Sequence, residues 1–179
     1  MSYLALDREL LLEALACLDE RMETQAHLVI GGGAAMVASY DHPLATRDID
    51  AMAVEGSPRI SDLERPARRV AAEIGLEPDW LNPYFETYAA VLPADYGSRL
   101  RSVYRGERLR VDSLGPEDLL VMKCFAGRDK DLAHARRLIR IADDLEIVDR
   151  QLTLLSERGY PGSLRAADYF DDLRDELEP

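Results

Sequence analysis

Two aspartates stand two positions apart in the short alternating segment Asp48-Ile49-Asp50. In a β-strand, residues i and i+2 point to the same face, about 6.5–7 Å apart. Two carboxylates at this spacing repel each other unless a positive group lies between them. Mg²⁺ meets that need, because it takes one or two carboxylates and completes its shell with water and phosphate oxygens. The alternative is a polar edge strand with two solvated aspartates, although aspartate is a poor strand former.

A pair of glycines follows an apolar run over residues 27–30 and precedes a helix-like segment over residues 34–40. Gly31 and Gly32 would allow a tight turn and a close approach of the backbone to a ligand. Free N–H groups at the start of a helix attract phosphate. Taken alone this is a weak signal, because many strand–glycine–helix turns are purely structural.

A lysine is an unusual choice in this chain, whose 22 basic residues include only Lys123 and Lys130 besides arginine. On a helix that starts at Pro116, Leu119 and Leu120 mark the apolar face, and Lys123 falls on that same face. A lysine there is costly unless it is paired or lines a cleft. It is therefore either a point charge for a triphosphate or a lysine whose stem lies along the helix edge. Lys130, between two aspartates, is interpreted as a surface residue.

Two further carboxylates are candidates for the same chemistry. Asp131 is either a helix N-cap or a partner that reaches back to Lys123 or towards the metal site. Asp112, at the end of the segment Leu109-Arg110-Val111-Asp112, could supply a third carboxylate, and a loop or cap role is equally open.

The segment over residues 99–110 is basic, with five arginines and the single acid Glu107. Such a patch could guide an RNA or nucleotide substrate. The alternative is a solvated hairpin that turns at Arg105-Gly106-Glu107.

The elements that must position these residues follow from hydrophobic periodicity. Helices are expected over residues 7–22, 61–75, 116–126, 131–143 and 146–158, and strands over 27–30, 48–54 and 100–111. The segment over residues 77–93 is irregular, with Trp80 as its anchor. The acidic tail from Ala166 is interpreted as a solvated end, with a short docking helix as the alternative. This order indicates an α+β (mixed α/β) fold with a helical C-terminal part.

The composition sets the broad class. The 179 residues, 47% apolar and 31% charged, favour one compact domain that can bury a core. No apolar run approaches the roughly 20 residues that span a bilayer, and the start of the chain shows no secretory signal. Two cysteines form no disulfide framework, so a cytoplasmic location is expected. The net charge of −12 argues against a generic nucleic-acid coat.

Together, Gly31-Gly32 and Thr46-Arg47-Asp48-Ile49-Asp50 resemble the active-site motif of the polymerase-β-type nucleotidyltransferase superfamily. The match extends to residues 75–82, 117–123 and 126–132, which resemble a prokaryotic nucleotidyltransferase-like family similar to the AbiEii-type toxins of toxin–antitoxin systems. The resemblance covers about residues 10–142, the expected core of a single domain over residues 1–179 in which residues 146–178 add C-terminal helices.

The resemblance implies a mixed sheet flanked by helices and a Mg²⁺-dependent transfer of a nucleotide from NTP to an acceptor. It implies that Asp48 and Asp50 hold Mg²⁺, that Gly31 and Gly32 cradle phosphate and that Lys123 contacts the triphosphate. Asp131 would help to activate the acceptor or position Lys123. Either Asp112 or Asp131 would take the acceptor's proton. The acceptor could be a tRNA 3′ end, a protein hydroxyl or a small alcohol, and a cognate antitoxin is a possible partner. The alternative is a degenerate, non-catalytic member of the fold that works as a binding or regulatory protein.

Overall fold

The structure is a computed structural model, and it describes residues 3–41, 43, 45–128 and 131–177. The chain divides into two compact units. The first, Met1–Thr87 with Leu100–Leu114, is called here the sheet unit, and the second, Tyr88–Arg99 with Gly115–Pro179, the helical unit. The single-domain organisation stays a prediction, because two compact units can still fold together.

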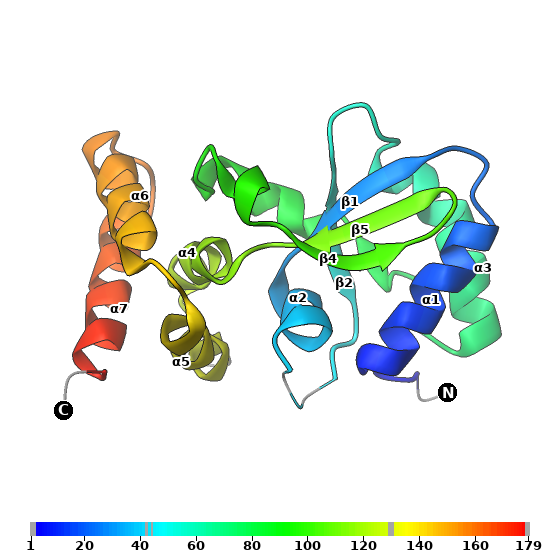
Figure 1. Ribbon diagram of the computed structural model, residues 1–179, viewed down its shortest axis with the longest axis horizontal. Helices are drawn as coiled ribbons and strands as arrows, with labels where there is room; N and C mark the ends of the chain where they lie inside the picture. The colour runs from blue at the N-terminus through cyan, green and yellow to red at the C-terminus, as the bar shows by residue number, and fades with distance from the viewer. Residues whose placement is uncertain (1–2, 42, 44, 129–130, 178–179) are drawn as a thin grey trace. The chain divides into compact units, whose positions relative to one another are not determined.

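A five-stranded mixed sheet organises the sheet unit, with the strand order β3-β2-β1-β5-β4 (Figure 1). The central strand β1 is antiparallel to β2 and parallel to β5, and β4 is antiparallel to β5. A sheet of mixed direction flanked by helices confirms the predicted α+β class. The strands are β1 (Ala26–Ile30), β2 (Ile49–Ala53), β3 (Leu81–Asn82), β4 (Arg101–Arg105) and β5 (Leu109–Ser113).

Three α-helices complete this unit: α1 (Arg8–Glu20), α2 (Gly32–Ser39) and α3 (Glu64–Ile74). The helix α1 begins where Asp7 accepts a hydrogen bond from the N–H of Leu10 at 2.9 Å, as an N-cap residue should. Both α1 and α2 contact β5, and α3 packs on α1. One face of the sheet packs into the core, because most of the alternating side chains that point to it are buried and apolar: Leu28, Ile30, Ile49, Ala51 and Val111.

The irregular segment before residue 93 is fixed by Trp80, as predicted. The indole is fully buried, and its N–H donates to the carbonyl of Ala67 on α3 at 2.9 Å. The carbonyl of Trp80 accepts from the N–H of Ile49, which starts the pairing between β2 and β3. Short 3₁₀ segments lie over Ile60–Leu63, Tyr84–Val91 and Tyr96–Arg99.

The helical unit contains α4 (Pro116–Ala126), α5 (Leu132–Ile141), α6 (Leu145–Glu157) and α7 (Ser163–Asp175). The helix α4 is its centre, because it contacts all three of the others. The interpretation of the acidic tail as a solvated end is wrong. In α7, Ala166, Phe170 and Leu173 recur at helical spacing and are buried against neighbouring helices. The acidic residues occupy the opposite, exposed face.

No helix in the described part of the chain is long and apolar enough to cross a membrane.

Candidate active site

The glycine turn lies at the end of β1, where the chain passes into α2. Gly31 is the N-cap residue of α2, and its N–H donates to the carbonyl of Asp50 at 3.0 Å. Gly32 has φ +59°, in the left-handed region that glycine adopts without strain. The turn therefore places the start of α2 directly beside β2, the strand that carries the aspartates.

The contact between Gly32 and Asp50 is the closest of the site. A Cβ on Gly32 would lie 2.7 Å from Oδ2 of Asp50, a distance that real Cβ atoms do not tolerate. A side chain on Gly33 would meet the hydroxyl of Thr46 at 3.0 Å. The two glycines thus let the start of α2 pack closely against the Asp50 carboxylate and the Thr46 hydroxyl.

Asp48 directly precedes β2 and is exposed. Its carboxylate accepts two long hydrogen bonds, each 3.4 Å, from the hydroxyl of Thr46 and the side-chain amide of Asn82. Asn82 is the second residue of β3, after the buried Leu81, and pairs with Asp50 across the ladder. Its side-chain oxygen accepts from the N–H of Tyr84 at 2.9 Å, which orients the amide towards Asp48. These contacts are weak and neutral, so oxygens of Asp48 can still bind a cation.

The donor set of this site fits Mg²⁺. Carboxylate and hydroxyl oxygens are hard ligands, and Mg²⁺ keeps several waters and substrate oxygens beside one or two carboxylates. Among the described residues, no group of three or more His, Cys, Asp or Glu side chains is placed to hold a metal ion. A Mg²⁺ ion held by two carboxylates therefore needs oxygens of a bound phosphate to complete its coordination shell. Asp48 and Asp50 as metal ligands stay a prediction.

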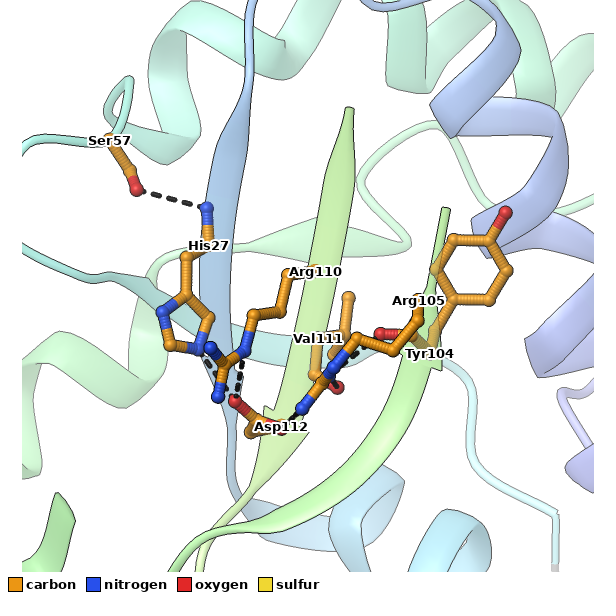
Figure 2. A network of polar contacts seen from close by, with 7 residues as sticks. All are labelled: His27, Ser57, Tyr104, Arg105, Arg110, Val111 and Asp112. Carbon is orange, nitrogen blue, oxygen red and sulfur yellow. Dashed lines mark hydrogen bonds and ion pairs between the residues drawn. The ribbon is translucent and has the colours of Figure 1, made fainter. Parts of the chain in front are cut away.

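Asp112 lies elsewhere on the sheet, on β5, and its carboxylate is enclosed by two arginines and a histidine (Figure 2). It accepts from Arg105 at 2.5 Å and Arg110 at 2.9 Å, and it bonds Nε2 of His27 at 2.6 Å. Burial would raise the pKa of Asp112, but the hydrogen bonds from Arg105 and His27 outweigh it and leave the pKa below its usual value. Its role as the third catalytic carboxylate stays a prediction.

Lys123 and Asp131 belong to the helical unit and form a buried ion pair. Lys123 Nζ lies 2.6 Å from Asp131 Oδ1, and their side chains are only 5% and 4% exposed. Asp131 also accepts from Arg128 at 2.5 Å. Burial acts to raise the pKa of Asp131, but the bonds from Lys123 and Arg128 lower it overall. Asp131 is the N-cap residue of α5, yet its side chain bonds Lys123 and Arg128 instead of capping the helix. Lys130 lies outside the described residues.

The sequence assigned no role to three side chains around these groups: Asn82 and Thr46, which lie in the matched motifs, and His27. Asn82 and Thr46 contact Asp48, and His27 contacts Asp112. The only local signal is that Asn82 follows a buried pair, Trp80-Leu81, as a polar residue at a strand end does. Nothing in the sequence links His27 to a residue 85 positions away.

Residues 8–157 match the model of a family described as a nucleotidyltransferase of unknown function (DUF6036). The chain belongs to this family. The match spans most of the chain and includes both glycines, both aspartates of β2 and the Lys123–Asp131 pair. It agrees with the mixed sheet and flanking helices described above. No curated protein and no solved structure matches the chain.

Proposed function

We propose that this nucleotidyltransferase family member moves a nucleotide from a Mg²⁺-bound NTP to an acceptor hydroxyl. The observation that carries the proposal is the close approach of Gly32 to Asp50. This close approach places the start of α2, whose N–H groups attract phosphate, beside a pair of carboxylates that suits Mg²⁺. Nucleotidyl transfer needs mainly positioning and charge neutralisation, which are what such a site can supply.

Each residue of the site has a separate proposed role. In this proposal Asp48 and Asp50 hold the ion, which when bound would neutralise charge on the phosphates. The N–H groups at the start of α2, from Gly32 onward, orient phosphate oxygens, because the N–H of Gly31 already donates to the carbonyl of Asp50. The acceptor oxygen attacks the α-phosphorus and gives up its proton to water, the bond to the bridging oxygen breaks, and pyrophosphate leaves.

Lys123 is proposed to contact the triphosphate, and Asp131 to position it. The buried bond between them supports the second role, because a carboxylate with its pKa lowered holds an ammonium in one place and is a weak proton acceptor. Asp112 resembles Asp131 in this respect, since its oxygens bind three donors. It is better suited to hold those donors than to act as a base.

The test is nucleotide labelling. Purified protein with Mg²⁺, each α-labelled NTP in turn, and total RNA or cell lysate should label an acceptor. The double variant Asp48→Asn/Asp50→Asn should lose at least about 100-fold of this activity and lose Mg²⁺-dependent NTP binding. Asp171→Asn, the same change on an exposed position of α7, is the matched control. NTP binding without labelling would favour a non-catalytic binding protein. Equal binding by the double variant would overturn the site.

The resemblance to AbiEii-type toxins adds a proposed role as the toxin of a toxin–antitoxin system. Induced expression should then arrest growth, and the arrest should disappear in the double variant. Normal growth under full expression of active enzyme would remove the toxin role and leave the transferase proposal intact.

A further inference from the structure

The cluster of His27, Arg105 and Arg110 around Asp112 carries more positive charge than one carboxylate requires. Asp112 is 2% exposed, and a buried carboxylate needs a partner. One arginine would meet that need. Two arginines and a histidine are present, and the arginine side chains are 44% and 53% exposed. The cluster therefore has one buried anion on its inner side and guanidinium groups on its outer side.

Several donors of the cluster are left over after Asp112 is satisfied. Arg110 bonds Asp112 through Nε, and its two terminal nitrogens have no partner among the residues that the structure describes. His27 uses Nε2, and in Figure 2 its other ring nitrogen points away from Asp112. The hydroxyl of Ser57 accepts from the backbone N–H of His27 at 2.9 Å and so keeps its own hydrogen to donate.

These groups border one hollow on the surface of the sheet unit. Its lining includes His27, Ser57, Arg105 and Arg110. Two acids, Glu55 and Glu107, also line it, but both are exposed, and Glu107 lies 3.8 Å from a third arginine, Arg108. The groups held in place at the hollow are thus donors, whereas its acids can turn towards solvent.

A buried carboxylate fixes the hairpin that presents the arginines. Asp19 on α1 accepts from three successive backbone N–H groups, those of Glu107, Arg108 and Leu109, at 3.0, 2.8 and 2.5 Å. A Cβ on Gly106 would lie 2.2 Å from this carboxylate, so only glycine fits there. Because these bonds hold the turn between β4 and β5 in one conformation, the turn loses less conformational freedom when a ligand binds.

We infer that this hollow is a phosphate-binding subsite for the acceptor, so that the acceptor of the proposed reaction is a nucleotide or a nucleic-acid strand. A guanidinium held through Nε presents a planar pair of donors, which matches two phosphate oxygens. The acceptor role rests on the proposed function, whereas the phosphate chemistry rests on the hollow alone.

The position of the hollow separates it from the NTP site. His27 precedes Gly31 by four residues on β1, which corresponds to about 13 Å along the strand. At about 3.4 Å of rise per nucleotide, this length spans roughly four nucleotides of one strand. The subsite would thus hold a strand several nucleotides from its reacting end, or a separate phosphate-bearing acceptor.

The test measures binding to a labelled 12-nucleotide single-stranded RNA by fluorescence anisotropy, without Mg²⁺ or NTP. Arg110→Gln and His27→Gln should each weaken binding at least about fivefold. Arg110→Gln should also reduce the slope of log affinity against log salt by about 0.7, the loss of one contact to a single strand. The matched control is Arg68→Gln, which removes an exposed arginine from α3 of the same unit and should change neither value.

Two further arms keep the test decisive. Displacement of the RNA by AMP or inorganic phosphate would identify a mononucleotide acceptor, and failure to displace it would identify the strand.

If Arg110→Gln unfolds the protein, a second measurement takes its place. The wild type is titrated with phosphate while the ¹⁵N shifts of the His27 ring are followed, and His27→Gln serves to assign them. Unchanged RNA binding in both Arg110→Gln and His27→Gln, or no shift of the His27 ring, would overturn the subsite. Loss of NTP binding in Asp48→Asn/Asp50→Asn is measured separately, so the two proposals can fail independently.

Discussion

Asp48 and the two carboxylates of the ion-pair clusters, Asp112 and Asp131, lie in opposite environments. Asp48 is exposed and accepts two long, neutral hydrogen bonds. Asp112 and Asp131 are buried and bind cationic donors at 2.5–2.9 Å. A carboxylate surrounded by cationic donors holds other side chains in place and stabilises the fold. One with weak contacts stays available to a metal ion. We therefore predict a metal-binding role for Asp48 and a positioning role for Asp112 and Asp131.

The largest expected effect is on the buried pair. Asp131→Asn leaves Lys123 buried without its charged partner and should reduce the free energy of unfolding by about 3–5 kcal/mol. Replacing both, with Lys123→Met and Asp131→Leu, should restore most of the loss. Denaturant unfolding measures the free energy of unfolding of the single and the double variant. Glu64→Gln, which breaks an exposed pair with Arg68 on α3, should cost at most about 0.5 kcal/mol. If Asp48→Asn destabilised the protein as much as Asp131→Asn, the difference between the weakly bonded Asp48 and the ion-paired Asp131 would have no energetic meaning.

The same pair predicts how stability depends on pH. The folded-state pKa of Asp131 is below the ordinary carboxyl value of about 3.9. Its stabilising contribution is therefore complete above that value and is lost as the pH falls through the lower folded-state pKa. Urea midpoints between pH 2 and 7 should fall more steeply in acid for the wild type than for the Lys123→Met/Asp131→Leu variant. If the urea midpoints of both proteins fell equally with pH, the ion pair would not be the cause of the pH dependence.

The glycine turn offers a matched pair of substitutions. Gly32→Ala and Gly56→Ala both place a side chain at positive φ, +59° and +86°, and each should cost about 1–3 kcal/mol. Only the Cβ at Gly32 meets Asp50, since nothing lies within 4 Å at Gly56. Gly32→Ala should therefore also weaken transfer by about 10- to 100-fold, as expected for a displaced reacting group. Equal activities of the two variants would show that the contact does not matter for the reaction.

The smallest expected effect concerns Asn82. Asn82→Ala removes one weak, neutral hydrogen bond to Asp48, so Mg²⁺-dependent NTP affinity should fall by about two- to tenfold. Thr87→Ala is the control, because within the described part of the chain the Thr87 hydroxyl bonds only the carbonyl of Tyr84, in the same 3₁₀ segment. The ratio of the two affinities, measured by titration calorimetry, compares the loss of the Asn82 side chain, with its bonds to Asp48 and to the N–H of Tyr84, with the loss of one local hydrogen bond. A loss much larger than tenfold would mean that Asn82 contacts the ligand directly.

The boundaries of the elements were predictable from the sequence where the signal is local. The apolar run before Gly31, the alternation over Asp48–Ile49–Asp50 and the proline that opens α4 all predicted the elements observed. Periodicity and capping act over a few residues, so they can be read along the chain. The tail was misinterpreted because its acidic residues dominate the composition, whereas three apolar residues one helical turn apart decide its packing.

The sequence by itself determined which residues could do chemistry: the glycine pair, the two aspartates of β2, and a lysine on an apolar helix face. Only the tertiary structure decided which carboxylates are surrounded by cationic donors. His27 meets Asp112 because β1 and β5 are neighbours in the sheet with a fixed register, and Asn82 meets Asp48 because β3 pairs with β2. Strand order and register depend on packing between segments far apart in the chain, which no local pattern encodes.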